Sequence, residues 1–160
     1  MKVGITGHQN IGSTSEIKWV ENSLIKAIRE YKVSEGFTCL AVGADQLFAE
    51  ILLKESIPCV AIIPSHNYEK TFENENDYKN YETLLSSAHK VIELNFEKPS
   101  EIAFFEAGKK VVNCSDIVFA IWDGKPVEGL GGTADVVEYA VMKNKAVIHF
   151  NPETQKVNIK

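Results

Sequence analysis

The chain has 160 residues, of which 44% are hydrophobic and 24% are charged, and its formal net charge is −5. This length and composition are typical of a globular protein that buries a sizeable core. Because the balance is acidic and Arg29 is the only arginine, we expect neither a broad basic surface nor nucleic acid as a partner.

The first half of the chain alternates apolar runs with segments of helical periodicity. These patterns predict strands over 2–6, 37–42 and 57–63 and helices over 17–31 and 47–52. We expect Ser15 or a neighbouring hydroxyl to cap the first helix and Gly36 to end it. Asp45 is the expected cap of the second helix.

The segment 68–80 is the most polar part of the chain and precedes a helix through Tyr81. Two interpretations remain open for it. It is either a solvated helical excursion or a flap over a ligand, in which Tyr68, Tyr78 and Tyr81 stack on a base.

The second half continues the alternation, with strands predicted over 91–94, 117–122 and 145–150 and helices after Pro99 and Thr133. Thr133 is the expected N-cap of the last helix. The alternation predicts an α/β fold, a Rossmann-like three-layer sandwich with a mostly parallel sheet of about six strands. We expect a single domain over 1–151 and a polar C-terminal tail over 152–160.

The three cysteines, Cys39, Cys59 and Cys114, lie in or beside apolar runs and form no CxxC pair. We expect reduced, buried thiols, no metal site and no bound cofactor. No apolar run approaches the ~20 residues of a membrane span, and no charged-then-apolar leader opens the chain. We therefore expect a cytoplasmic protein without a membrane partner.

Several loops follow predicted strands and precede predicted helices, and they begin at Gly7, Gly43, Pro64 and Gly124. Right-handed crossovers place such loops at one edge of a parallel sheet, where α/β proteins bind ligands. Neither GxGxxG nor GxxxxGK[ST] follows the first strand. The segment 129–133, three glycines and a threonine within five positions, is therefore the best candidate phosphate cradle. The alternative is a tight connection with a threonine cap.

The loops supply the candidate ligand-binding residues, which are Gly7, His8, Gly43, Ala44, Asp45, Pro64, Ser65, His66, Trp122, Asp123, Gly124, Gly131, Gly132 and Thr133. Asp123 either accepts hydrogen bonds from ribose hydroxyls or only shapes an Asp-Gly turn. Trp122 either stacks on a base or belongs to the core. His8 and His66 either meet over the ligand as catalytic groups or are polar surface groups.

Asp135 and Glu138 occupy the first turns of the last predicted helix. Negative charge there stabilises the helix but repels a phosphate. We expect these carboxylates to point elsewhere or to meet a sugar.

Short motifs extend over the whole chain in the order Gly4-Ile5-Thr6-Gly7-His8, Ala41-Val42-Gly43-Ala44-Asp45, Ile62-Ile63-Pro64-Ser65, Ser115-Asp116 and Gly131-Gly132-Thr133-Ala134-Asp135. This order resembles the SLOG superfamily of Rossmann-like proteins, which includes DNA-processing protein A and the Lonely Guy enzymes. The chain looks most similar to stand-alone bacterial members. The resemblance implies a nucleotide or nucleotide-derived ligand, such as an ADP-ribose-like molecule, and a homodimer or higher homo-oligomer.

The chain departs from the catalytic members of these families at one position. Lonely Guy enzymes carry a PGGxGTxxE motif whose glutamate works in glycosidic cleavage, and deoxyribosyltransferases place a glutamate at the same spacing. Aligned on Gly132 and Thr133, that position holds Val136. Asp135 and Glu138 are the tentative catalytic substitutes, although a shift of one or two helix positions turns a side chain by ~100–200°.

The leading hypothesis is therefore binding, as a sensor or carrier, of a nucleotide-type small molecule. The alternative is an N-glycosidase, phosphoribohydrolase or deoxyribosyltransferase that acts on nucleoside monophosphates. The sequence leaves open whether the protein is an enzyme.

Overall fold

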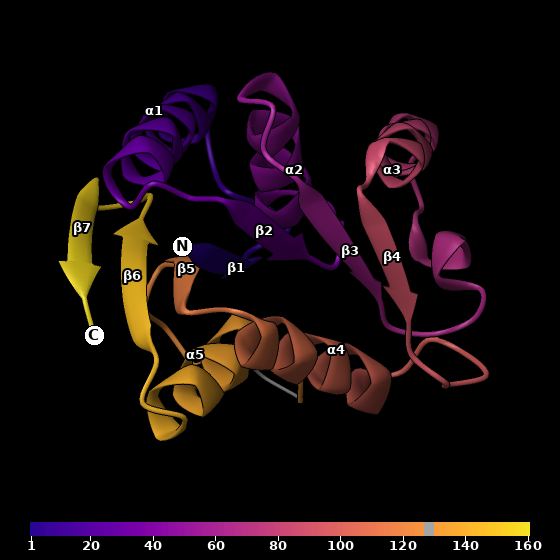
Figure 1. Ribbon diagram of the computed structural model, residues 1–160. Coiled ribbons are helices and arrows are strands. Elements are labelled where there is room, and N and C mark those ends of the chain that lie inside the picture. The colour runs from indigo at the N-terminus through magenta and orange to yellow at the C-terminus, as the bar shows by residue number, and fades with distance from the viewer. Residues whose placement is uncertain (127–129) are drawn as a thin grey trace.

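A computed structural model describes residues 1–126 and 130–160. Seven strands form one sheet in the order β4-β3-β2-β1-β5-β6-β7 (Figure 1). The strands are β1 (Lys2–Gly7), β2 (Glu35–Thr38), β3 (Cys59–Ile63), β4 (Lys90–Glu93), β5 (Ile117–Ile121), β6 (Ala146–Asn151) and β7 (Lys156–Ile159). All neighbouring pairs are parallel except β6 and β7, which are antiparallel.

Helices cover both faces of the sheet, so the predicted three-layer α/β sandwich is confirmed (Figure 1). The helices α1 (Thr14–Glu30), α2 (Ala44–Lys54) and α3 (Glu75–Ser87) lie on one face, and α4 (Glu101–Cys114) and α5 (Thr133–Met142) lie on the other. A short 3-10 helix, η1 (Tyr68–Thr71), precedes α3. The central strands β3 and β5 are buried at every position, as expected for parallel strands covered on both faces.

Helix α1 shows how local sequence sets an element's start. The Ser13 hydroxyl accepts the Glu16 N–H at 3.3 Å, and the Glu16 carboxylate accepts the Ser13 N–H at 2.6 Å. This reciprocal capping box satisfies two otherwise free donors. The predicted hydroxyl cap is therefore Ser13 rather than Ser15.

The second strand and its surroundings differ from the prediction. Strand β2 ends at Thr38 because the backbone leaves the extended conformation at Leu40, whose φ is 56°. Gly36 lies inside β2 and does not end α1, which stops at Glu30. Side-chain hydrophobicity at 37–42 does not reveal this turn, since Leu40 is buried although it is outside the strand.

Two predicted helix caps were wrong. The N-cap of α2 is Gly43, and Asp45 lies inside its first turn. The N-cap of α5 is Gly132, so Thr133 is the first helical residue. In both helices a glycine occupies the position that we assigned to a side-chain acceptor.

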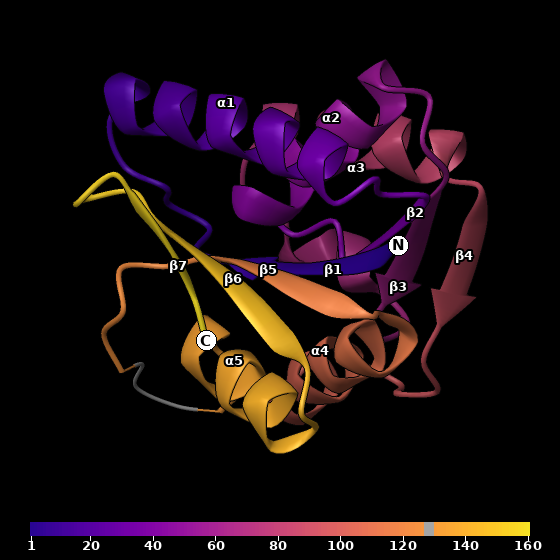
Figure 2. The ribbon, with the colours of Figure 1, turned by 60° about the vertical axis from the view of Figure 1, so that its left-hand side comes forward.

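The C-terminal segment also differs from the expected polar tail. Residues 156–159 form β7, which pairs with β6 along the edge of the sheet (Figure 2). All four β7 residues are exposed. No face of this strand is buried, so its sequence lacks the alternation that marks a half-buried strand.

Candidate ligand-binding site

A cleft of about 500 Å³ opens at the carboxyl edge of the sheet. It extends over the ends of β1, β2 and β3 and reaches the start of α5. The chain passes from β1 through β2 and β3 to β4 on one side and then returns to place β5 on the other side of β1. The cleft therefore lies at the point where the strand order reverses, which is the usual ligand site of an open α/β sheet.

The structure brings seven of the predicted site residues together on the wall of this cleft. They are Gly7, His8, Asp45, Pro64, Gly131, Gly132 and Thr133. The other seven predicted residues, Gly43, Ala44, Ser65, His66, Trp122, Asp123 and Gly124, do not line it. Gly129, which we also assigned to the glycine-rich turn, lies outside the described residues.

Gly43 and Ala44 contact the loop after β1, which lines the cleft. The Ala44 N–H donates to the His8 carbonyl at 3.1 Å. Gly43 has a φ of 87°, and a Cβ there would lie 2.2 Å from the Gln9 carbonyl oxygen. The β2–α2 connection therefore packs backbone to backbone against the loop after β1, and only glycine permits this approach.

The start of α5 presents backbone N–H groups without a side-chain cap. Side chains of Ser13, Asn74 and Ser100 cap α1, α3 and α4. The helices that begin with a glycine N-cap and no side-chain bond are α2 and α5, and the first turns of both line the cleft. Free N–H groups and the positive end of the helix dipole favour an anion at such a position.

The two acids in the first turns of α5 have different surroundings. The Asp135 carboxylate accepts the Gly131 N–H at 2.7 Å and so closes the turn before the helix. Glu138 is exposed and does not line the cleft. Val136, at the position of the expected family glutamate, is buried and lines the cleft.

Asp45 is the buried acid of the cleft, and 6% of it is exposed. Its Oδ2 accepts the Thr38 hydroxyl at 3.0 Å and the Cys39 N–H at 2.8 Å. Burial raises the pKa of Asp45 to about 6, although hydrogen bonds from Cys39, Thr38 and the Ala41 backbone act in the opposite direction. The cleft therefore contains a carboxyl group that changes charge close to neutral pH.

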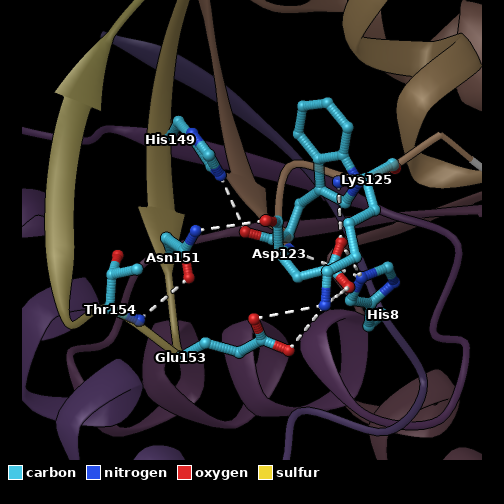
Figure 3. Close-up of polar contacts among 8 residues, drawn as sticks. His8, Asp123, Lys125, His149, Asn151, Glu153 and Thr154 are labelled. Atoms are coloured by element: carbon cyan, nitrogen blue, oxygen red, sulfur yellow. Dashed lines mark hydrogen bonds and ion pairs between the residues drawn. The ribbon is translucent and has the colours of Figure 1, made fainter.

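Asp123 belongs to a polar network beside the cleft (Figure 3). Its Oδ1 accepts the Lys125 N–H at 2.9 Å and lies 3.2 Å from His8 Nε2. Lys125 Nζ in turn contacts Glu153 Oε1 at 3.0 Å (Figure 3). His8 and Asp123 line a second hollow of about 280 Å³, and His8 also lines the cleft.

The remaining predicted residues take part in packing or pair outside the cleft. Trp122 is 7% exposed, donates from Nε1 to the Lys125 carbonyl at 2.8 Å and packs against His149. His66 pairs with Glu93 at 3.3 Å and does not line the cleft that His8 lines. Ser65 is fully buried and donates to the His66 carbonyl at 3.0 Å.

An aromatic wall was only partly foreseen. Tyr68 lies 5.5 Å from Phe72 and 6.3 Å from Phe104, measured between ring centroids, and all three rings line the cleft. The flap interpretation of the sequence included Tyr68. Phe104 was not predicted, and it comes from α4, on the face of the sheet opposite to α3. A contact between segments so far apart in the chain leaves no local sequence signal.

Within residues 1–126 and 130–160, no group of three His, Cys, Asp or Glu side chains is arranged to hold a metal ion. In the same part of the chain, no helix has the length and apolar character to cross a bilayer. The three cysteines are free thiols. Burial raises the pKa of the Cys39 thiol well above its usual value, and the nearby Asp45 charge adds to this, so the thiol stays protonated at neutral pH.

The fold is similar to that of DNA processing protein A. Over 92% of this chain and 49% of the Streptococcus pneumoniae protein, the TM-score is 0.66 at 16% sequence identity. Over 93% of this chain and 64% of the Helicobacter pylori protein, which is described with a single-stranded DNA binding mode, it is 0.64 at 18% identity. The chain thus spans about half to two thirds of the length of these proteins.

A molybdenum cofactor binding protein from the phototrophic bacterium Rippkaea orientalis has the same fold. The TM-score is 0.60 at 20% identity over 94% of this chain and 76% of that protein. The sequence matches no protein-family model and no curated protein. At these identities the comparisons show the fold, and they confirm the predicted Rossmann-like fold.

Proposed function

We propose that the protein binds a nucleotide or a nucleotide-derived small molecule in the cleft at the carboxyl edge of the sheet. One observation carries the proposal: the cleft lies where the strand order reverses, and the start of α5, which has no side-chain cap, forms part of its wall. The phosphate lies on the backbone N–H groups of Gly132, Thr133 and the residues that follow. A volume of about 500 Å³ is within the range of small-molecule sites.

The chain's charge favours a small ligand over a nucleic acid strand. The net charge is −5 and Arg29 is the only arginine, so the chain has no excess of positive charge to neutralise the many phosphates of a strand. One or two phosphates on a helix N-terminus need no arginine. The fold is shared both with a molybdenum cofactor binding protein and with a protein that has a single-stranded DNA binding mode. A gel-shift assay with single-stranded DNA at low salt is therefore the natural control, and we expect no shift.

Isothermal titration calorimetry with nucleoside monophosphates, ADP-ribose, cyclic ADP-ribose and dinucleotides tests the proposal. Gly132→Asp is the informative variant, since aspartate is a favoured N-cap whose carboxylate occupies the helix N–H groups and repels phosphate. Gly132 has φ −74° and ψ 174°, which any residue adopts. We expect this variant to keep its fold and lose binding by at least tenfold.

Gly132→Ala is the matched control, because alanine adds neither charge nor cap and leaves the N–H groups free. We expect it to bind within a few-fold of the wild type. Folded wild-type protein that binds no member of the panel contradicts the proposal. Binding that is equal in wild type and Gly132→Asp contradicts the placement of the phosphate.

A second candidate function is cleavage of the N-glycosidic bond of a nucleoside monophosphate. The observation that favours it is the Asp45 carboxyl, which lines the cleft with a pKa of about 6 and so suits general acid–base work. Release of free base from nucleoside monophosphates, measured by chromatography, is the test. Base release that survives Asp45→Asn excludes this role for Asp45.

Assembly and location remain proposals from the family resemblance. We propose a homodimer or higher homo-oligomer in the cytoplasm. Light scattering coupled to gel filtration measures the mass in solution, and a mass of 17.8 kDa, that of one chain, contradicts the oligomer.

A further inference from the structure

Tyr68 carries a polar group inside the cleft that the protein itself leaves without a partner. The residue is 5% exposed, and its ring packs edge-on against Phe72, Tyr81 and Phe104. Among the described residues, no side chain or backbone group bonds to the Tyr68 hydroxyl, although every fully buried polar side-chain atom there has a partner. The hydroxyl oxygen is therefore not sealed in the core but meets the space of the cleft, whose wall includes Tyr68.

The Tyr68 hydroxyl shares the cleft with two other polar side chains, those of Cys39 and Asp45. Burial, and then the charges of Cys39 and Asp45, raise the pKa of Tyr68 well above its usual value. The hydroxyl is therefore neutral at physiological pH and both donates and accepts a hydrogen bond. Cys39, Asp45 and Tyr68 all line the cleft.

The side chains around these polar groups are apolar and aromatic. Phe72 and Phe104 line the same end of the cleft as Tyr68, since the Tyr68 ring contacts both. A flat heteroaromatic ring packs well against aromatic side chains. The edge of such a ring also carries hydrogen-bond donors and acceptors that bond to a hydroxyl. A ribose or a phosphate alone does not combine a flat ring with such edge groups.

The aromatic group and the start of α5 belong to different parts of the same cleft. Tyr68 follows β3 and Gly132 follows β5, and the order β3-β2-β1-β5 puts β2 and β1 between these two strands. A nucleoside monophosphate carries its base and its phosphate at opposite ends, so one ligand in the cleft can contact both.

We propose that Tyr68 determines specificity for the base of the bound nucleotide. The base lies among Tyr68, Phe72 and Phe104 at the β3 end, its edge bonds to the Tyr68 hydroxyl, and the phosphate lies on α5. The ligand class is then a nucleotide with an intact base rather than a sugar phosphate. This inference rests on the proposed function and adds the orientation of the ligand to it.

Tyr68→Phe tests the inference because it removes one oxygen and keeps the ring in the aromatic cluster. The probes are AMP, GMP, CMP, UMP and ribose 5-phosphate, each titrated by calorimetry. In the wild type we expect at least one nucleotide to bind more tightly than ribose 5-phosphate. In Tyr68→Phe we expect that nucleotide to bind about tenfold more weakly, the loss typical of one hydrogen bond in a desolvated site. Ribose 5-phosphate should bind both proteins alike.

Tyr78→Phe is the matched control. It makes the same chemical change on a tyrosine whose hydroxyl bonds to Glu82 at 2.8 Å and which does not line the cleft. We expect its affinities to equal those of the wild type. Thermal unfolding of both variants verifies that each is folded.

The outcomes separate the two proposals. If neither the nucleotides nor ribose 5-phosphate bind the wild type, the proposed function fails. If nucleotides bind but Tyr68→Phe binds them as tightly as the wild type, the function stands and the role of Tyr68 is overturned. Ribose 5-phosphate that binds as tightly as every nucleotide also overturns it.

Discussion

His8 Nε2 lies 3.2 Å from Asp123 Oδ1, so the loop after β1 is joined to the loop after β5 across the point where the strand order reverses. The His8 N–H also donates to the Ile121 carbonyl at 3.0 Å, which extends the pairing of β1 and β5 by one residue. His8 lines both the cleft and the smaller hollow. Asp123 therefore contacts a residue of the cleft wall, His8, and is not itself on that wall.

Asp123→Asn should lower the stability of the protein at neutral pH and leave it little changed in acid. Burial raises the pKa of Asp123, but hydrogen bonds from Lys125 and His8 and their charges outweigh this, so the net pKa lies below the usual 3.8. A lowered pKa stabilises the fold above pH 3.8, and the effect is lost as pH falls through the folded value. We expect a loss of about 0.5 to 1 kcal/mol at pH 7, the size typical of partly exposed ion pairs.

Urea unfolding of both proteins between pH 3 and pH 7 measures the difference. Glu138→Gln, a change at an exposed acid of α5, is the control and should match the wild type. A stability gap between wild type and Asp123→Asn that stays constant over the whole range contradicts the assignment to the Asp123 charge.

The pKa of Asp45 is shifted in the opposite direction to that of Asp123. Its pKa is raised from 3.8 to about 6, so between these values the folded protein binds a proton that the unfolded chain does not. Stability therefore falls as pH rises through this window, and the cost is fully present above pH 6 and absent below pH 3.8. Asp45→Asn removes this titration. We expect the unfolding free energy of the wild type, relative to the variant, to fall by on the order of 2 to 3 kcal/mol from pH 4 to pH 7.

The same urea unfolding series measures this change. The control is Asp123→Asn, in which the trend with pH runs in the other direction. A wild-type advantage over Asp45→Asn that grows as pH rises contradicts a raised pKa for Asp45.

The periodicity of apolar residues was sufficient to predict the sandwich, the mostly parallel sheet and the edge of the sheet where the loops meet. Those features follow from which side chains are apolar, and six of the seven strands carry that signal. Strand β7 does not, because Lys156–Ile159 is exposed on both faces and depends on backbone pairing with β6. The end of β2 was missed for a related reason, since a buried Leu40 with positive φ is apolar without being extended.

The site was harder to predict than the fold. Loop position alone identified Gly7, Asp45 and Gly131 as residues near a ligand, and the structure places them on the cleft. The same argument also selected Asp123, which lines the smaller hollow and contacts His8 there. Phe104 was not foreseen, since its place depends on how α4 crosses the sheet.

Gly43 and Gly124 make a matched pair for testing how backbone contact shapes the cleft. Both have φ of 87°, a conformation that side chains disfavour. A Cβ at Gly43 would lie 2.2 Å from the Gln9 carbonyl oxygen and 2.5 Å from that of His8, whereas at Gly124 the nearest atom of the described residues is 3.9 Å away. We expect Gly124→Ala to cost about 1 kcal/mol. Gly43→Ala should cost about 3 kcal/mol or more, because both strain and overlap with backbone act there.

Equilibrium unfolding in urea measures both costs. Equal costs for the two substitutions contradict the close approach of the loop after β1 to the start of α2. If Gly43→Ala remains folded, its nucleotide affinity should also fall, because the same contact positions His8 and Asp45 on the cleft.

Asp135→Asn and Glu138→Gln distinguish a structural from a catalytic role for the acids of α5. Asp135 closes the turn by accepting the Gly131 N–H at 2.7 Å, while Glu138 is exposed. An asparagine oxygen still accepts this N–H, but without charge assistance, so we expect Asp135→Asn to cost about 1 kcal/mol of stability. The looser turn should weaken nucleotide binding a few-fold, whereas Glu138→Gln should leave both quantities unchanged. Calorimetry, urea unfolding and a base-release assay on the best-binding nucleotide measure the three properties together. A release activity that Asp135→Asn or Glu138→Gln abolishes, with affinity and stability intact, contradicts the structural role and supports an acid of α5 in catalysis.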